Sequence, residues 1–443
     1  MTYKISIDSI PIIDNHCHAS QLEQRKRHTV TTTRQYREVF AQGYLESRIP
    51  PAAWYRYMDA VKKHDTAAID KIDAQYRTRQ LMEQSLEMFS SNMFTRTLRM
   101  GCMQLHDEWD DQERLNQLST EARREGGGRF FQRVLDLANC PLILTDTPRL
   151  DRTQWPEKRF RWIVRLDPFL YPFGPGNAAP RGTEVEAWYD RFAYKLELSL
   201  REQELDAPPK DFGDYLDFVD RAFESFLQRG AVAFKFVSAY VRSLEFKPVA
   251  EGEAARAFRD MARGYKGESR LFEDYLARRM MLKAAALRVP VQIHCGMGHA
   301  EPGMDFFENN PIKLQSLLMD ERLSNLPVVL LHGAYPFCSE AGALAWTYGN
   351  VFLDFSWMTY LHHHFLIDRL NEWLEYLPAN KLVFGTDTGM QEMWIGTVRM
   401  GRRAIETALS RGVEDQIWDE SQAMWLAERI CYRNVCDIYG FSL

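Results

Sequence analysis

Short apolar runs rich in β-branched and aromatic residues recur along the chain, each bounded by polar or turn-forming residues. Eight of them are strand candidates: residues 10–14, 141–146, 160–166, 231–237, 289–294, 327–332, 350–356 and 381–387. Between most of them lie stretches with helical periodicity, such as the one at 211–230, which ends at a glycine as helices often do. Strands that alternate with helices pair in parallel. Eight such units therefore predict an α/β protein with a closed (β/α)8 TIM barrel.

The spacing of the predicted strands is uneven. More than a hundred residues separate the first two strands, and we interpret residues 20–130 as a mainly helical insertion after strand 1. The segment 167–182, DPFLYPFGPGNAAPRG, is rich in proline, glycine and aromatic residues and predicts an irregular loop. Both segments leave from carboxyl ends of strands, where TIM barrels keep their active sites. We therefore expect residues 1–443 to form a single barrel domain with both segments over its mouth.

The composition is that of a soluble globular protein, because 45% of the 443 residues are hydrophobic and 26% are charged. The net charge of −6 argues against a nucleic-acid partner, since no basic excess is present to neutralise phosphates. The seven cysteines lack CxxC spacing, which is typical of reduced thiols. No apolar stretch is long enough to cross a bilayer and no signal peptide is evident, so we expect no membrane partner and a cytoplasmic location.

Side chains that bind metals stand at the ends of the predicted strands. The segment PIIDNHCH, residues 11–18, places two histidines one residue apart, and on a strand such side chains face the same way. The full set is His16, His18, Lys235, His294, His332 and Asp387. Each one alone could be a polar plug at a strand end. Because a closed barrel brings its strand ends to one rim, together they predict a divalent metal site, for zinc first, with iron, manganese or nickel as alternatives.

These segments also carry a resemblance to a known family. The HxH of IIDNHCH, the IHCG and LLHGAYP strands and the late FGTDTG resemble the amidohydrolase superfamily of metal-dependent (β/α)8 hydrolases. The closing LAERICYRNVCDIYGF, residues 426–441, resembles the terminal helix of its amidohydrolase-related branch. The resemblance runs from the first strand to the C-terminus, apart from the long insertion. It is a poor guide to the substrate, because that branch also holds decarboxylases, lactonases and relatives of uronate isomerase.

The resemblance implies roles for five of the strand-end residues. His16, His18, His294 and Asp387 match the positions of metal ligands in the family. In one-metal members, the histidine at the position of His332 stands nearby as an acid/base or as an oxyanion stabiliser. In two-metal members it binds the second ion. One or two ions are therefore both compatible with the sequence.

Lys235 falls on the fourth predicted strand, where two-metal members carry a carbamylated lysine that bridges the ions. A buried lysine with a depressed pKa could react with CO2 and become an anionic oxygen ligand. The alternative is a lysine that pairs with a substrate carboxylate or with Asp387. We favour the carbamate, because a basic side chain that points into a metal rim must avoid charge repulsion.

The predicted chemistry follows from these ligands. A bound divalent ion lowers the pKa of its water from 15.7 to roughly 7, which generates hydroxide at neutral pH. The resemblance implies that Asp387 takes the proton from that water, because it stands where the superfamily uses an aspartate in this role; it would then hand the proton to the leaving group, as general acid/base catalysis requires. His332, or a second metal, would polarise the scissile carbonyl.

Four further residues are candidates for substrate contacts. Arg165 on strand 3 and Arg242 after strand 4 could hold a carboxylate, since the guanidinium fork matches it bidentately. Ion pairing within the protein is the alternative for each. Tyr240 and Trp357, just past strands 4 and 7, could wall the pocket or belong to the core. The run LHHH, residues 361–364, is interpreted as the start of a helix that meets solvent.

The leading hypothesis is a hydrolase that cleaves an amide, lactone or related C–N or C–O bond of a small carboxylated metabolite. A non-hydrolytic decarboxylase and a sugar-acid isomerase are the alternatives. Two metals with a carbamate on Lys235 would favour hydrolysis, whereas one metal with His332 unligated would raise decarboxylation to the same level. A scaffold protein would be expected to have lost ligands, yet every expected position is filled. The partner is a small-molecule substrate, and the oligomeric state stays open, homo-oligomers included.

Overall fold

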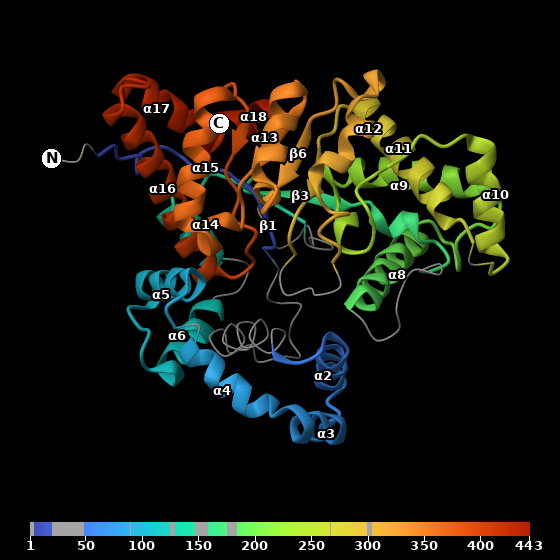
Figure 1. The fold of residues 1–443 in the computed structure, drawn as a ribbon, viewed down its shortest axis with the longest axis horizontal. Coiled ribbons are helices and arrows are strands. Elements are labelled where there is room, and N and C mark those ends of the chain that lie inside the picture. The colour runs from blue at the N-terminus through green and yellow to red at the C-terminus, as the bar shows by residue number, and fades with distance from the viewer. Residues whose placement is uncertain are drawn as a thin grey trace.

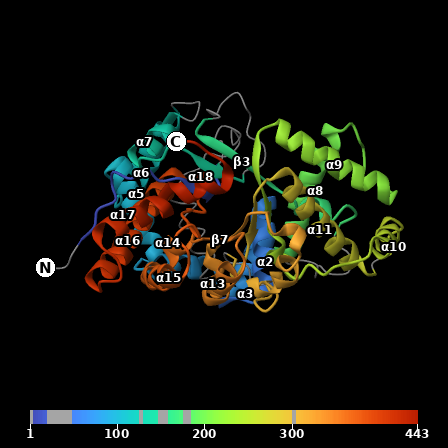
Figure 2. The same ribbon diagram turned by 90° about the horizontal axis from the view of Figure 1, so that it is seen from above.

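The computed structural model shows parallel strands with helices packed around them (Figure 1). The view from above shows the helices distributed around the strands (Figure 2). The residues that the structure describes are 4–19, 48–88, 90–124, 129–146, 158–174, 184–265, 267–298 and 304–443.

Eight strands form one parallel sheet in which each strand pairs with the next along the chain. They are β1 (Asp14–Cys17), β2 (Ile143–Thr145), β3 (Phe160–Arg165), β4 (Ala231–Phe236), β5 (Val291–His294), β6 (Val328–Leu331), β7 (Val351–Asp354) and β8 (Leu382–Val383). Backbone hydrogen bonds from Asn15 N to Phe384 O (2.9 Å) and from Thr386 N to His16 O (3.1 Å) join the two ends of the sheet. The predicted TIM barrel is confirmed.

The first strand lies later in the chain than predicted. We expected residues 10–14, whereas β1 begins at Asp14. Pro11 has no N–H to donate, and the amides of Ile12 and Ile13 bond to the carbonyls of Asn139 and Cys431 instead of to β2. His16 therefore lies within β1, and His18 follows the strand directly.

Helices and short helical turns form the layer outside the strands. The α-helices after β2 are α8 (Glu184–Glu202), α9 (Phe212–Gln228), α10 (Glu251–Ala262), α11 (Ser269–Leu287), α12 (Gln315–Leu318), α13 (Cys338–Thr347), α14 (Met358–Leu361), α15 (His363–Tyr376), α16 (Gln391–Glu414), α17 (Glu420–Glu428) and α18 (Asn434–Tyr439). The short turns are η2 (Asp167–Leu170), η3 (Ser238–Tyr240), η4 (Pro311–Leu314), η5 (Glu321–Leu323), η6 (His332–Ala334) and η7 (Arg429–Arg433).

The hydrophobic core has two layers, as the barrel architecture requires. The interior of the ring is filled by small and branched side chains, among them Ile163, Ala233 and Val329, each buried. The larger layer lies between strands and helices. In α9 the aromatic residues recur at helical spacing and are buried against the sheet, and Asp211 caps the helix by accepting from the amides of residues 213 and 214.

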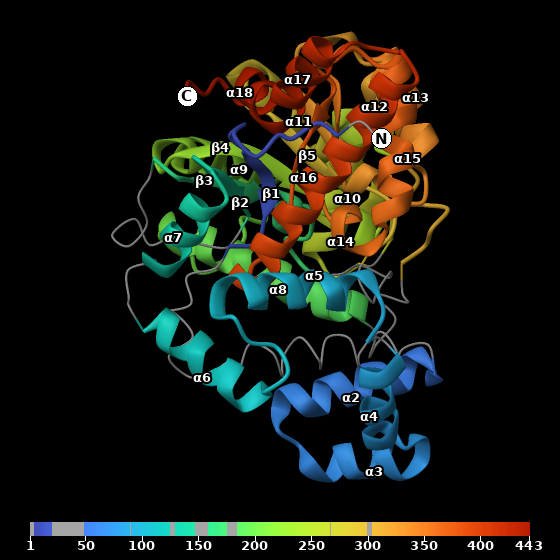
Figure 3. The ribbon, with the colours of Figure 1, turned by 90° about the vertical axis from the view of Figure 1, so that its left-hand side faces the viewer.

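Six helices lie between β1 and β2 in the described part of the chain. They are α2 (Pro51–Lys63), α3 (Thr66–Tyr76), α4 (Thr78–Met88), α5 (Met93–His106), α6 (Gln112–Arg123) and α7 (Arg129–Leu137). The group α2, α3 and α4 has a small core of its own around Trp54 and Ile72, and it stands apart from the barrel in two views (Figures 1 and 3; Figure 3 is turned by 90°). In contrast, α7 packs on the barrel, where Phe131 contacts Phe160 and Trp394.

Helix α5 is fixed across α16 by a close approach of the two backbones (Figure 3). A Cβ atom on Gly101 would lie 1.7 Å from the carbonyl oxygen of Glu392, and one on Gly396 would lie 2.2 Å from that of Thr97. Only glycine permits such an approach. The sequence thus specifies where the helical segment docks on the barrel.

The segment 167–182, predicted as an irregular loop, begins with η2, whose residues Asp167–Leu170 are all buried. Residues 175–183 lie outside the described part of the chain, as do residues 20–47 of the predicted insertion. Among the described helices, none is both long and apolar enough to span a membrane.

Candidate metal centre

Two histidines and an aspartate converge at the carboxyl end of the barrel. His16 and His18 come from β1 and the residue after it, and Asp387 follows β8, the neighbouring strand. Oδ1 of Asp387 lies 3.2 Å from Nε2 of His16 and 2.8 Å from Nε2 of His18. The ligand atoms of the three residues all lie within 4.8 Å of one another. This part of the predicted site is therefore brought together by the fold.

The backbone at the site is strained. Asp387, His332 and Trp357 adopt φ angles of 55°, 63° and 70°, a region that residues other than glycine rarely occupy. Each such residue costs on the order of 1–3 kcal/mol and persists only where its surroundings hold it. Such strain clusters at functional sites, and here it occurs at three residues that the sequence predicted for the site.

His294 and His332 contact each other through their imidazole rings. Nδ1 of His294 lies 2.9 Å from Nε2 of His332, and Nδ1 of His332 lies 2.9 Å from Oγ of Ser356. Nε2 of His294 is buried and has no hydrogen-bond partner among the described residues. If Nδ1 of His294 donates to His332, the lone pair on Nε2 of His294 remains free; the opposite tautomer would leave a buried N–H without an acceptor. The first tautomer is therefore favoured.

Lys235 and Arg165 both bind a carboxylate that the sequence reasoning missed, Asp146. Nζ of Lys235 lies 3.2 Å from Oδ2 of Asp146 and 2.7 Å from Nε2 of His16. Nε of Arg165 lies 2.7 Å from the same Oδ2, and Oδ1 lies 2.5 Å from Nδ1 of His18. Asp146 follows β2 directly, so the strand-end rule that found the other residues would have found it as well.

Burial and charge set the ionisation of these groups. Burial and the charge of Lys235 lower the pKa of His16 to about 4, and burial lowers the pKa of His332 to about 3. Burial alone would raise the pKa of Asp387, but the imidazoles of His332 and His18 hold it well below its ordinary value. At neutral pH the site therefore presents a carboxylate beside the neutral imidazoles of His16 and His332, which are the forms that bind metals.

Further pKa shifts affect the residues around Asp146. Burial opposes ionisation of Asp146, but Arg165, His18 and Lys235 hold its pKa well below the ordinary value. Burial lowers the pKa of Lys235, although Asp146 opposes the shift. Burial also acts to lower the pKa of His18, but Asp146 and Asp387 outweigh it and raise the pKa.

The residues present fit a divalent metal ion. His16, His18 and Asp387 supply nitrogen and carboxylate oxygen atoms in one place, the donor set that zinc and related ions use. The buried Nε2 atom of His294 is a fourth nitrogen whose lone pair lacks a partner among the described residues. His18 is oriented by its contact with Asp146, as metal-bound histidines are commonly oriented by carboxylates.

Two aromatic groups flank the histidines. The Tyr240 ring lies 4.3 Å from that of His294 and stacks on Trp188 of α8, also at 4.3 Å between ring centroids. Trp357 lies 5.5 Å from His332. The structure thus places Tyr240 and Trp357 beside the site, and adds Trp188, which the sequence pattern did not distinguish from core.

Arg242 lies elsewhere. Its guanidinium forms buried ion pairs with Glu273, at 3.1 Å, and with Asp274, and it packs over the ring of Phe246. Its side chain is only 2% exposed. These contacts leave it no free face for a substrate carboxylate, so ion pairing within the protein, the alternative interpretation of the sequence, describes its placement.

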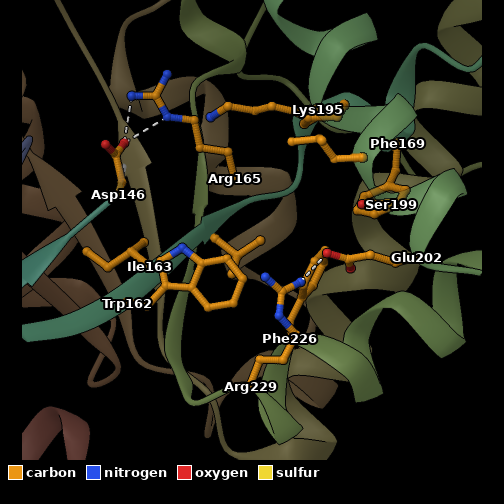
Figure 4. A pocket seen from close by; sticks show the side chains of 13 residues that line it. Asp146, Trp162, Ile163, Arg165, Phe169, Lys195, Ser199, Glu202, Phe226 and Arg229 are labelled. Carbon is orange, nitrogen blue, oxygen red and sulfur yellow. Dashed lines mark hydrogen bonds and ion pairs between the residues drawn. The ribbon is translucent and has the colours of Figure 1, made fainter. Parts of the chain in front are cut away.

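A small cavity of about 70 Å³ lies beside Arg165, between β3, α8 and α9 (Figure 4). Asp146 lines it and so connects it to the histidine cluster. Figure 4 shows the amine of Lys195 directed toward Arg165, with Trp162 and Phe169 among the apolar walls. Burial, followed by the charge of Arg165, lowers the pKa of Lys195 to about 7. The basic side chains of Arg165 and Lys195 therefore approach each other in this cavity next to the site.

A family model described as Amidohydrolase matches residues 146–405 of the chain. A curated relative, Protein fluG of Emericella nidulans, is 30% identical over 227 residues, which are 48% of this chain but only 26% of that protein. The chain thus matches about a quarter of the length of this relative.

Solved structures with the same fold cover nearly the whole chain. A Lactobacillus casei protein, provisionally named a metal-dependent hydrolase, has a TM-score of 0.67 at 19% identity and covers 99% of this chain and 98% of its own. A uronate isomerase from Thermotoga maritima has a TM-score of 0.66 at 15% identity, with 98% and 95% covered. A glucuronate isomerase from Caulobacter crescentus has a TM-score of 0.65 at 15% identity, with 99% and 92% covered. At these identities the likeness establishes the fold.

Proposed function

The chain belongs to the amidohydrolase family, and from this premise we propose that it is a metal-dependent hydrolase of small carboxylated metabolites. The bond cleaved would be that of an amide, a lactone or a related C–N or C–O linkage. The observation that carries the proposal is the convergence of His16, His18 and Asp387 within 4.8 Å at the mouth of the barrel. Such a donor set is what a hydrolytic metal site needs.

The residues that would hold the ion are His16, His18 and Asp387, together with His294 through its buried Nε2. Zinc is the expected metal, with manganese, iron or nickel as alternatives. When bound, the ion supplies Lewis acidity and an acidified water molecule. The contact between His294 and His332 favours a single ion, because His332 then accepts from His294 and orients it.

Asp387 would act as the base of the reaction. Its pKa lies well below the ordinary value, so it is a carboxylate at neutral pH and can accept a proton from water. Its Oδ2 lies 3.9 Å from Nδ1 of His332, a neutral imidazole. These two groups form an acid–base pair beside the reacting centre, suited to moving a proton onto a leaving group.

Lys235 would contact substrate rather than carry a carbamate in a one-ion site. Its amine is engaged by Asp146 and by His16, the arrangement of a cation held between an acid and an imidazole. The low pKa that burial produces is also what carbamylation requires, so a carbamate is the alternative if a second ion is present.

Recognition of a substrate carboxylate is assigned to Arg165 and Lys195. Arg165 uses Nε and one terminal nitrogen on Asp146, and a guanidinium carries five N–H donors in all. Its charged end also lies over the ring of Trp188, 5.6 Å from the centroid. Together with Tyr240, this ring would provide the apolar wall for the carbon skeleton.

A sugar-acid isomerase is the second candidate. One observation favours it: the two uronate isomerases share the fold over 98–99% of this chain, a span that includes the helical segment between β1 and β2. An acid–base pair such as Asp387 and His332 can also move a proton between neighbouring carbons. A decarboxylase remains the alternative that a single ion allows.

The mass of the product distinguishes these reactions. The metal-loaded protein is incubated with N-acyl amino acids, lactones, uronates and aromatic or enoic acids, and products are analysed by mass spectrometry. Products whose summed mass exceeds that of the substrate by one water identify hydrolysis, unchanged mass with a new retention time identifies isomerisation, and loss of CO2 identifies decarboxylation. The Asp387→Asn variant serves as the control for contaminating activity. Turnover without gain of water would overturn the proposed hydrolase.

A further inference from the structure

A second cleft lies away from the metal centre. It has a volume of about 550 Å³ and opens between α5, the first turns of α15 and the second half of α16. This volume is that of a small-molecule site. Its lining residues, all within the described part of the chain, include no acidic side chain and no residue of the candidate metal centre.

The cleft is strongly basic in a chain whose net charge is −6. Four arginines line it. Two of them are engaged: Arg411 pairs with Asp368 at 2.8 Å, and Nε of Arg96 donates to the carbonyl of Ser91 at 3.1 Å. The other two, Arg99 from α5 and Arg403 from α16, are exposed and have no carboxylate partner in the part of the chain that the structure describes. Uncompensated positive charge from two walls favours an anion between them.

The beginning of α15 adds donors to the same cleft. The helix is fourteen residues long, starts at His363, and its N-cap residue makes no side-chain hydrogen bond. The first amides of a helix have no partner within it and attract anions. His363 is 6% exposed, lines the cleft, and its Nδ1 atom has no hydrogen-bond partner among the described residues. The expectation that the LHHH run meets solvent is therefore wrong for His363, because this side chain is packed at the cleft.

The walls of the cleft are apolar and adaptable. Met93 and Met100 come from α5, and the buried Met400 comes from α16. Methionine has an unbranched, polarisable side chain that adjusts to ligands of different shape. The cleft thus combines an anion-binding end with an apolar surface, which calls for a ligand with both features.

We propose that this cleft binds a small phosphorylated organic molecule. Its phosphate group lies between Arg99, Arg403 and the start of α15, and its organic part lies on the methionines. Phosphate is assigned rather than carboxylate because two guanidinium forks and a helix N-terminus offer more donors than the two oxygens of a carboxylate can accept. The site is independent of the proposed hydrolase, since the two share no residue.

The test is calorimetric titration of the metal-loaded protein with phenyl phosphate as the probe. We expect saturable one-site binding that weakens at least tenfold in the double variant Arg99→Gln/Arg403→Gln. Inorganic phosphate is expected to bind more weakly than phenyl phosphate, because it lacks the organic part. Both arginines are exposed, so the variants are expected to fold, and circular dichroism verifies it.

Arg263→Gln is the matched control. This arginine is exposed at the end of α10, so the variant has the same kind of charge change away from the cleft. Its affinity is expected to equal that of the wild type. Unchanged affinity in the double variant would place the phosphate outside this cleft and overturn the proposal. Equal affinity for benzoate and phenyl phosphate would overturn the assignment of phosphate.

Discussion

One buried acid, Glu392 of α16, binds both α5 and α6 of the helical segment between β1 and β2, and its removal gives a quantitative prediction. The carboxylate accepts hydrogen bonds from His106 of α5 at 2.8 Å, from Ser119 of α6 at 2.8 Å and from both terminal nitrogens of Arg123 at 2.9 and 2.5 Å. Its side chain is 1% exposed and that of Arg123 is 12% exposed. Every one of these bonds crosses between the segment and the barrel.

The variant Glu392→Gln keeps the shape of the side chain but removes its charge. The Arg123 guanidinium then stays buried without a counter-charge, and the NH2 half of the new amide faces donors where a carboxylate oxygen accepted from them. Removing one partner of a buried pair costs about 3–5 kcal/mol. We expect α5 and α6 to open on the order of a hundred to several thousand times more often.

Hydrogen exchange measured by mass spectrometry follows this opening directly. Peptides from residues 93–123 should exchange faster by that factor, whereas peptides from the strands should not. The matched control is Glu197→Gln, which breaks an exposed i,i+4 pair with Arg201 and is expected to cost about 0.3–0.5 kcal/mol. If Glu392→Gln accelerates exchange no more than this control does, the anchoring role assigned to Glu392 is refuted.

Four further predictions concern the charge network and the site. Burial acts to raise the pKa of Glu392, but Arg123 and His106 outweigh it and hold the pKa well below the ordinary 4.5. Docking of α5 and α6 is therefore fully stabilised above pH 4.5 and weakens as the pH falls below 4.5. Hydrogen exchange at several pH values checks this dependence. Elemental mass spectrometry of protein prepared without chelator should find one divalent ion per chain, and chelation should abolish turnover. Asp387→Asn should lower kcat by roughly 10²–10⁴-fold at unchanged fold, measured with the substrate that the product assay identifies. Arg165→Gln should raise KM for a carboxylated substrate roughly 10- to 100-fold, with no such change for its amide analogue.

Much of the fold follows from the sequence because a parallel barrel repeats one simple pattern. Seven of the predicted ranges contain the whole observed strand, since a buried strand needs a short apolar run whatever its surroundings. The first strand was misplaced because its apolar run bonds to the carbonyls of Asn139 and Cys431, which a local pattern does not reveal.

The site was predictable as far as it rests on strand ends. His16, His18 and Asp387 meet because adjacent strands deliver them, and Asp146 obeys the same rule although it was overlooked. Lys195 and Trp188 lie in a helix that is distant in sequence from the strand ends, so only the packed structure brings them near. Arg242 shows the converse. Its position after β4 favours a substrate contact, but its guanidinium pairs with Glu273 and Asp274 of α11.

Two buried acids form hydrogen bonds to the residues that precede strained positions of the site. Asp14 accepts from the amide of Thr386 at 2.9 Å and from its hydroxyl at 2.6 Å, and so fixes the residue before the left-handed Asp387. Asp354 accepts from the amide of Ser356 at 2.8 Å, the residue before Trp357.

Each acid thus fixes the residue that precedes one with a positive φ angle, a conformation that costs on the order of 1–3 kcal/mol. Without these hydrogen bonds the chain would relax at both positions, and Asp387 and Trp357 would turn away from the histidines. The strain is compatible with the fold only because the carboxylates are buried where solvent does not compete for the same amides. Preorganisation of the candidate metal centre therefore rests on the buried acids of strands β1 and β7 as much as on the ligands themselves.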